Sequence, residues 1–136
     1  KLLDKQCIPT RAYVGDAGLD LYARIPKLIS IGQHTTAKIP TGICVEIPQG
    51  YVGLLLPRSS YNVKGLIEPV GTIDSGYRGE ISAAITNATD VPYHVNPYDK
   101  IAQLVIVPIA QIDSLNFVDE LSKSERGVNG FGSSGK

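Results

Sequence analysis

Glycine and proline recur along the whole chain and cut it into short segments, and this feature limits the possible folds more than any other. The sequence holds 14 Gly and 9 Pro. They recur at intervals of about ten residues, and the segments between them are rich in Ile, Val, Leu, Thr and Tyr. Such spacing is typical of an all-β sandwich or barrel. It predicts strands at residues 28–31, 36–39, 43–47, 51–56, 81–87, 91–95 and 101–109.

One segment favours a short helix instead. Ser59 and Ser60 precede a run that ends at Gly65, directly after Pro57. Hydroxyl side chains favour helix starts and glycine favours helix ends. We therefore expect one or two helical turns here, with the serine hydroxyls as caps.

Charge and composition exclude several classes of protein. The 13 Lys and Arg residues balance the 13 Asp and Glu residues, so binding to nucleic acid or to an anionic membrane is not expected. No apolar run approaches the about 20 residues that cross a bilayer, and no signal peptide is visible at the start. We expect a cytoplasmic protein, with a nuclear or virion-associated location as alternatives for a eukaryotic or viral source.

The cysteines and one sequon have plain interpretations. Cys7 and Cys44 show no metal-ligand spacing with His34 or His94, so we expect structural thiols. Asn87-Ala88-Thr89 fits the glycosylation sequon, but without a secretion signal we interpret it as accidental.

The last fifteen residues differ in composition from the rest. Residues 122–136 hold four Gly, four Ser and two apolar side chains, Val128 and Phe131. Such a segment cannot build a core, so we expect a β domain at residues 1–121 and a flexible arm at 122–136. The arm spells G-x-G-x-x-G from Gly130 to Gly135, but this motif needs a strand before it and a helix after it. We therefore reject a nucleotide-binding fingerprint here.

Two clusters carry chemistry. Residues 71–81 combine Asp74 and Tyr77 with three glycines between apolar stretches, which indicates a hairpin whose backbone can approach a ligand closely. The alternative is a tight turn in which Asp74 bonds nearby amides. Arg58, Ser59 and Ser60 place a guanidinium and two hydroxyls at a helix start, which suits an anion. The alternative there is an ordinary capped turn with a surface arginine.

Five segments together resemble the five motifs of the trimeric dUTP pyrophosphatase family. They occur in the family's order and cover nearly the whole chain from residue 17 onward. The segments are Ala17-Gly18-Leu19-Asp20-Leu21, Pro57-Arg58-Ser59-Ser60, residues 71–81, Ile101-Ala102-Gln103-Leu104 and residues 126–135. The resemblance implies a jelly-roll β protomer, a homotrimer with active sites shared between subunits, and Mg²⁺-dependent hydrolysis of dUTP to dUMP and pyrophosphate. This reaction keeps uracil out of DNA and supplies dUMP for thymidylate synthesis.

The resemblance also implies roles for individual residues. Asp74 would orient the attacking water and act as general base. Tyr77 would lie against the deoxyribose and leave no room for a 2′-hydroxyl. Main-chain groups would read the uracil edge, at Gly71, Thr72, Ile73 and Ser82.

The remaining implied roles concern the triphosphate. Arg58, Ser59, Ser60 and Gln103 would hold the phosphates. Mg²⁺ would sit on phosphate oxygens through water without a protein cage, and Asp20 would assist nearby. In the arm, Phe131 would stack on uracil. Arg126 and the hydroxyls of Ser133 and Ser134 would reach the γ-phosphate. Gly132, which precedes these serines, belongs to the same substrate-binding segment.

Two alternatives stay open. A dCTP deaminase-related enzyme would need an acid/base at the pyrimidine amino group, for which Glu68 and Glu80 are the candidates. An inactive jelly-roll interaction module would have lost motif residues, whereas here they are present. Three positions, Leu19, Tyr98 and Lys100, differ from the residues usual in the family. Glu68 has no assigned role, and His34 and His94 match no motif. Arg78 and Glu80 are expected as strand-surface or subunit-contact charges.

Overall fold

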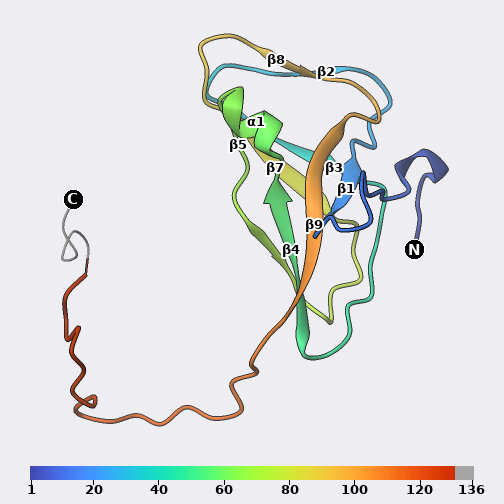
Figure 1. Ribbon diagram of the computed structural model, residues 1–136. Coiled ribbons are helices and arrows are strands. Elements are labelled where there is room, and N and C mark those ends of the chain that lie inside the picture. The colour runs from blue at the N-terminus through green and yellow to red at the C-terminus, as the bar shows by residue number, and fades with distance from the viewer. Residues whose placement is uncertain (131–136) are drawn as a thin grey trace.

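The computed structural model describes residues 1–130, and strands dominate that part of the chain (Figure 1). The strands are β1 (Leu19–Tyr22), β2 (Ile29–Ile31), β3 (Thr36–Pro40), β4 (Tyr51–Pro57), β5 (Leu66–Ile67), β6 (Gly71–Ile73), β7 (Ser82–Asn87), β8 (Tyr93–Val95) and β9 (Lys100–Pro108). The helical elements are a 3₁₀ turn, η1 (Lys5–Cys7), and a single short α-helix, α1 (Ser59–Val63). The expected all-β class is confirmed.

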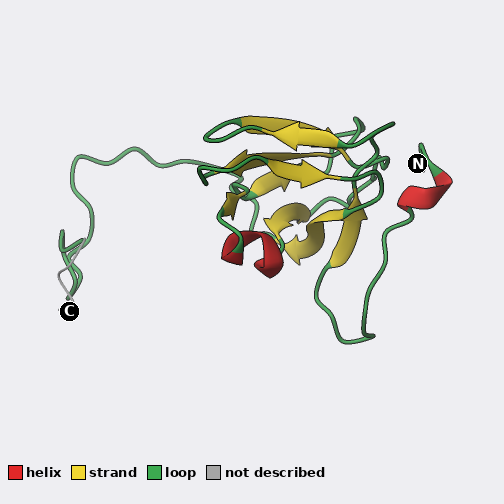
Figure 2. Ribbon diagram, turned by 90° about the horizontal axis from the view of Figure 1, so that it is seen from above, coloured by secondary structure: helices red, strands yellow, loops and turns green. Residues whose placement is uncertain are grey.

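The strands pair antiparallel in three sheets, which Figure 2 shows from above in stacked layers. The strand orders are β1-β9-β4-β6, β3-β7-β5 and β2-β8. Alternate residues of β7 are buried, as expected for a strand with one face on a core. Leu21, Leu55 and Ile101 of the four-stranded sheet join Ile39 and Ile85 of the three-stranded sheet in one apolar cluster. The core therefore lies between two sheets, as in a β-sandwich.

Most expected strands are found close to their expected bounds, with one clear error. Residues 43–47 form no strand, and Ile43 makes only an isolated bridge to Leu2. Gly42 turns the chain there at a φ of +76°, and Ile43 and Ile47 are buried without a ladder partner. The apolar content of residues 43–47 therefore led to the prediction of a strand that the structure does not contain. The strands β1, β5 and β6, which are 4, 2 and 3 residues long, were not predicted.

Helix α1 is present, but its start differs from the expectation. Arg58 is the N-cap and makes no side-chain capping hydrogen bond, so the expected hydroxyl caps are wrong. The serines instead occupy the first helical turn, where both are exposed. Gly65 ends the helix as expected, with a φ of +74° and its N–H donating to the Asn62 carbonyl over 3.1 Å.

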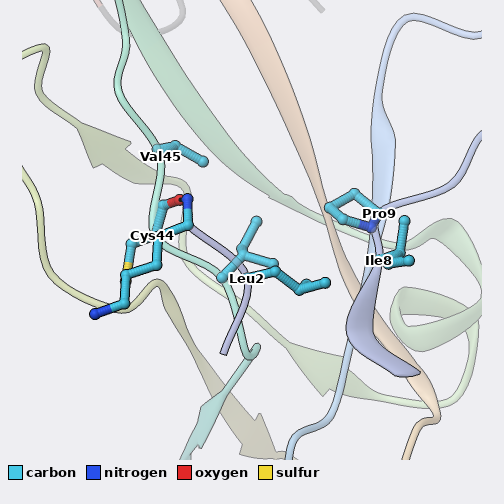
Figure 3. Close-up of a pocket in the computed structure, with 7 residues that line it drawn as sticks. Leu2, Ile8, Pro9, Cys44 and Val45 are labelled. Carbon is cyan, nitrogen blue, oxygen red and sulfur yellow. Dashed lines mark hydrogen bonds between the residues drawn. The ribbon is translucent and has the colours of Figure 1, made fainter. Parts of the chain in front are cut away.

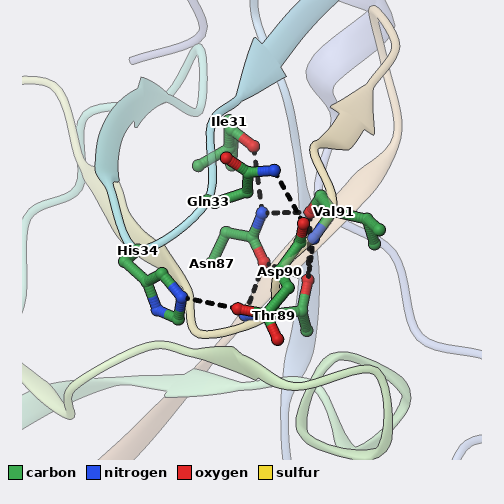
Figure 4. Close-up of polar contacts among 7 residues, drawn as sticks. All are labelled: Ile31, Gln33, His34, Asn87, Thr89, Asp90 and Val91. Atoms are coloured by element: carbon green, nitrogen blue, oxygen red, sulfur yellow. Dashed lines mark hydrogen bonds and ion pairs between the residues drawn. The ribbon is translucent and has the colours of Figure 1, made fainter.

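Asn87 at the end of β7 organises the loop to β8 (Figure 4). Its side chain is fully buried, and its amide nitrogen donates to the carbonyls of Ile31 and Val91. Its amide oxygen accepts from the backbone N–H and the hydroxyl of Thr89. A sugar could not reach this nitrogen, which agrees with the interpretation of the sequon as accidental.

After Pro108 the chain leaves the body of the protein (Figure 1). Residues 109–130 contain no helix or strand, and large apolar side chains among them are exposed, including Ile112, Phe117 and Leu121. Among residues 1–130, no helix is both long and apolar enough to cross a membrane. The predicted division at residue 122 stays a prediction.

Candidate active site

The first group of predicted residues meets where β1, β9 and β4 run side by side. Asp20 of β1 lies opposite Gln103 of β9, and Gln103 lies opposite Leu56 of β4. Arg58 follows directly after β4. Three motifs that are distant in sequence therefore come together through strand pairing, and we call Asp20, Arg58, Ser59, Ser60, Lys100 and Gln103 the phosphate cluster.

Asp20 holds two cations in this cluster. Its Oδ1 lies 3.3 Å from Arg58 Nε, and its Oδ2 accepts from Lys100 Nζ at 2.8 Å. Arg58 Nη1 also donates to the Lys100 carbonyl over 3.2 Å. The hydrogen bond to Asp20 raises the pKa of Lys100 above its usual value. Asp20 therefore fixes the direction of the Arg58 guanidinium.

Lys100 is a functional candidate that the sequence reasoning missed. Its position was noted only as a departure from the family pattern. Its contact with Asp20 spans 80 residues, so no local signal could have revealed it. The only hint was its place three residues before Gln103 in the same motif region.

Gln103 depends on a glycine across the sheet. Its Nε2 donates to the Pro57 carbonyl over 3.2 Å. A Cβ added at Gly18 would lie 2.8 Å from Gln103 Oε1 and 3.2 Å from Val105 Cγ2. Gly18 therefore leaves the space that the Gln103 amide occupies.

The second group of predicted residues lies on the hairpin that begins with β6. Gly71, Thr72 and Ile73 form β6 and pair with Leu55, Leu54 and Gly53 of β4. The turn then exposes Asp74, whose carbonyl accepts the Tyr77 N–H at 3.0 Å. The Asp74 carboxylate makes no hydrogen bond or ion pair among residues 1–130. The alternative of a turn closed by the Asp74 side chain is therefore not what the structure shows.

Tyr77 and Ser82 frame the far side of the hairpin. The Tyr77 hydroxyl donates to the Glu80 carbonyl over 3.1 Å. A Cβ on Gly79 would overlap the Tyr77 ring, so this glycine lets the ring lie across the hairpin. Ser82 begins β7 and lies opposite Pro40. The ring of Tyr77 is 43% exposed and available to a ligand.

Glu80 was expected as a strand-surface or subunit-contact charge, and the structure shows it in an ion pair within its own chain. Its carboxylate accepts from Arg24 Nε and Nη2 at 2.8 and 2.7 Å, and from the Gly42 N–H at 2.8 Å. The hydrogen bond from Arg24 lowers the pKa of Glu80. Arg78 does lie on the surface, where its Nη2 is 3.3 Å from Glu46. Glu80 therefore anchors the end of the hairpin within its own chain.

Glu68 lies between β5 and β6, where the chain passes from one sheet to the other. Its side chain is 5% exposed, and neither carboxylate oxygen has a hydrogen-bond partner among residues 1–130. Burial raises the pKa of Glu68 to about 8. The carboxyl group is therefore protonated at neutral pH, which sequence reasoning did not foresee.

The two groups of site residues lie at opposite ends of β4. Ile73 pairs with Gly53 near the start of β4, whereas Arg58 follows its last residue. Five residues of strand span roughly 17 Å at about 3.4 Å per residue. One phosphate cannot contact both Arg58 and Asp74 of the same chain.

The remaining predicted residues lie in the arm. Arg126 is exposed, and its Nε donates to the Asn129 carbonyl over 3.0 Å. Phe131, Gly132, Ser133 and Ser134 lie outside the described residues. The arm residues therefore stay predictions.

An apolar pocket on the N-terminal side contains none of the predicted site residues (Figure 3). Its volume is about 250 Å³, and Leu2, Ile8, Pro9, Ile43 and Cys44 contribute to its lining. Cys7 and Cys44 are both free thiols, as expected for structural cysteines. Because none of the predicted site residues lines this pocket, it is not the candidate active site.

The sandwich fold with the glycine-rich hairpin after β6 defines a jelly-roll protein. The family model that matches residues 4–135 is described as dUTPase. The chain belongs to the dUTPase family.

Individual relatives agree with this family over almost their full length. The deoxyuridine 5'-triphosphate nucleotidohydrolase of Bordetella avium is 41% identical over 143 residues, covering 100% of this chain and 95% of the relative. That of Ralstonia pickettii is also 41% identical, with coverages of 100% and 96%. The solved Staphylococcus bacteriophage 80alpha dUTPase with dUPNHPP has a TM-score of 0.91 at 36% identity, covering 100% of this chain and 96% of that chain.

A further solved structure bears on the metal. A mutant dUTPase from phage phi11 of S. aureus, described as coordinating a structural Mg(II) ion, has a TM-score of 0.78 at 32% identity, covering 88% of this chain and 95% of that chain. Residues 1–130 of the present chain contain no group of three or more His, Cys, Asp or Glu side chains that could hold a metal.

Proposed function

We propose that this chain hydrolyses dUTP to dUMP and pyrophosphate, with Asp74 as the general base. The observation that carries the proposal is the exposed, unpaired Asp74 carboxylate on the glycine-rich hairpin of a dUTPase-family chain. Water forms a bond to the α-phosphorus, its proton passes to Asp74, and the bond from the α-phosphorus to the bridging oxygen breaks. The reaction removes a uracil nucleotide before it enters DNA and yields dUMP for thymidylate synthesis. Because the substrate is a free nucleotide, we place the reaction in the cytoplasm.

The hairpin is suited to reading uracil. Strand β6 is the edge strand of its sheet, so main-chain groups of Gly71, Thr72 and Ile73 on its outer side can bond the uracil edge. Ser82 supplies a further main-chain contact, and Tyr77 lies against the deoxyribose. A site that bonds a polar edge rejects ligands that leave its groups unpaired. We expect discrimination against cytosine by hydrogen bonding and against thymine by shape.

The phosphate cluster holds the triphosphate. Arg58, Ser59, Ser60 and Gln103 contact phosphate oxygens, and Asp20 positions the guanidinium through its ion pair. Both Asp20 oxygens already face cations, so this carboxylate fits a supporting role better than direct ligation. We propose that Mg²⁺ binds to phosphate oxygens and water, which matches its reluctance to lose its waters. Bound there, it would neutralise phosphate charge.

The functional unit is a homotrimer with shared active sites. The separation of Arg58 and Asp74 along β4 supports a site in which they come from different subunits. The exposed apolar residues of segment 109–121 supply surface for contact between chains.

The arm at 122–136 comes from a third subunit. Arg126 reaches the γ-phosphate, Phe131 stacks on uracil, and Ser133 and Ser134, next to Gly132, bond phosphate.

Truncation after Glu125 should reduce kcat/KM for dUTP at least about tenfold, because a charge-assisted contact worth about 1.5 to 3 kcal/mol is lost. The melting temperature should hardly change, since residues 109–130 form no helix or strand. Steady-state kinetics and thermal unfolding measure both quantities.

Mixing the truncated protein with the Asp74→Asn variant tests the shared site. After subunit exchange, a site can combine an intact Asp74 with an intact arm, so activity should exceed the sum of the separate proteins. A monomer that is fully active at micromolar concentration would contradict the trimer.

Gly18→Ala should weaken phosphate binding through Gln103. The added Cβ would lie 2.8 Å from Gln103 Oε1 and displace this amide. Loss of its phosphate contact should reduce kcat/KM about 10-fold, or more if Val105 also shifts. Gly15→Ala is the matched control, because a Cβ there meets nothing within 4 Å. Equal kinetics for the two variants would show that Gly18 does not position Gln103.

Incubation with each deoxynucleoside triphosphate and Mg²⁺ tests the proposed reaction itself. We expect pyrophosphate release from dUTP and little from dCTP or dTTP. Ammonia release from dCTP would indicate the deaminase alternative. No release from any nucleotide would favour the inactive interaction module.

A further inference from the structure

A second pocket, with a polar lining, lies beside α1 and next to the phosphate cluster. Its volume is about 340 Å³. We call it the α1 pocket, and the lining residues used below are Arg58, Ser60, Lys64, His94, Asp99 and Lys100. Arg58, Ser60 and Lys100 also belong to the phosphate cluster. Lys64 and His94 match no motif and have no role in the proposed reaction. The pocket therefore extends the phosphate cluster in a direction that the reaction does not use.

Positive charge exceeds negative charge in this lining. Three cations, Arg58, Lys64 and Lys100, face one carboxylate, Asp99. The Oδ2 atom of Asp99 is already bonded by the N–H and the side-chain nitrogen of Asn96, at 2.8 and 3.3 Å. A pocket of this kind attracts an anion.

Lys64 is the cation in the pocket that is left without an acidic partner. Arg58 and Lys100 both pair with Asp20. Within residues 1–130, Lys64 has no ion pair, and its Nζ lies 5.6 Å from the centre of the Tyr93 ring. This placement keeps the ammonium over the ring beside the pocket, where a bound anion would neutralise it.

The aromatic residues of the pocket offer no platform for a base. Tyr61 is 4% exposed. Tyr61 and Tyr93 pack edge to face, with ring centres 5.7 Å apart, and Lys64 lies over Tyr93. A nucleobase would find no free ring on which to stack. The chemistry favours a small anion over a whole nucleotide.

We propose that the α1 pocket is a binding site for inorganic pyrophosphate. Lys64 and His94 hold one phosphoryl group, and Arg58 and Ser60 hold the other. The choice of pyrophosphate among small anions rests on the proposed function, in which it is the product. Because Arg58 and Ser60 are shared, pyrophosphate in this pocket competes with dUTP, so the site makes the enzyme sensitive to its own product.

Calorimetric titration of the full chain with pyrophosphate, without Mg²⁺, tests the site. Lys64→Gln should weaken pyrophosphate binding about tenfold or more, as expected for one charge-assisted contact. Lys64→Arg keeps the charge and should bind within about threefold of wild type, given that a tenfold change corresponds to about 1.4 kcal/mol. Lys38→Gln, an exposed lysine on β3 outside the pocket, is the matched control and should bind as wild type does.

Inhibition of dUTP turnover by pyrophosphate gives a second reading. The inhibition constant should rise in Lys64→Gln in parallel with the dissociation constant. Binding by Lys64→Gln within twofold of wild type, or equal losses in Lys64→Gln and Lys38→Gln, would overturn the proposal. If only the proposed function were wrong, the result would be distinguishable: pyrophosphate would still bind through Lys64, but the protein would not hydrolyse dUTP.

Discussion

Replacing Asp74 with Asn should lower kcat for dUTP about 10²- to 10⁴-fold, the usual loss when a general base is removed. The amide has the size of the carboxylate but cannot accept the proton of the attacking water. Asp74 is exposed, and its backbone carbonyl, rather than its side chain, accepts the Tyr77 N–H. The hairpin should therefore keep its conformation, and the affinity for a non-hydrolysable dUTP analogue should stay near that of wild type.

Rapid kinetics and analogue titration measure the two quantities separately. Asp90→Asn is a suitable control, because the Asp90 side chain is 97% exposed and pairs only with His34 among the ion pairs of residues 1–130 (Figure 4). If Asp74→Asn kept more than half of the wild-type kcat, Asp74 would not be the base. A large loss of analogue affinity would show instead that the carboxylate positions the ligand.

Replacing Glu68 with Gln should stabilise the fold, and the gain should grow with pH. Burial raises the pKa of Glu68 from the unfolded value of 4.5 to about 8. Between these values the unfolded carboxyl ionises while the folded one must stay protonated, so the unfolded state binds fewer protons and wild-type stability falls as pH rises. The shift of about 3.5 pH units corresponds to about 4 to 5 kcal/mol at full extent. Gln cannot ionise and escapes this loss.

Denaturant unfolding of both proteins at pH 5, 6, 7 and 8, at one protein concentration, measures the effect. The difference in unfolding free energy should be small at pH 5, increase by about 1.4 kcal/mol per pH unit, and level off above pH 8. Glu120→Gln removes an exposed carboxylate and should show a difference that does not change with pH. A constant difference for Glu68→Gln would mean that this carboxyl is hydrated in the folded protein.

The local chemistry of the site could be predicted from the sequence because it resides in contiguous residues. The hairpin needs glycines beside Asp74 and Tyr77, and Gly79 indeed leaves room for the Tyr77 ring. Helix α1 ends at Val63, two residues before Gly65, because a left-handed residue at that position stops a helix. The composition of the short segments between glycines and prolines likewise predicted strands such as β7, and alternate residues of β7 are buried on the core.

Contacts between distant residues were decided by the tertiary structure alone. Lys100 reaches Asp20 across 80 residues, and Gly18 leaves space for Gln103 because β1 lies beside β9. Glu80 was expected as a strand-surface or subunit-contact charge, and the turn at Gly42 brings the Gly42 N–H and Arg24 to its carboxylate. The periodicity of apolar residues along a strand does not identify its neighbouring strands, because strand pairing depends on how the whole sheet is buried.

The sequence by itself determined the all-β class and the clusters at residues 58–60 and 71–81, because each follows from residue types over a few consecutive positions. The roles assigned to Arg58 and Asp74 came from the resemblance to the dUTPase family. Only the tertiary structure placed Arg58 and Asp74 at opposite ends of β4 and buried Glu68 between two sheets. Register and burial are properties of the packed chain, because hydrogen bonding fixes distances along a strand and the surrounding sheets exclude water from a carboxyl group.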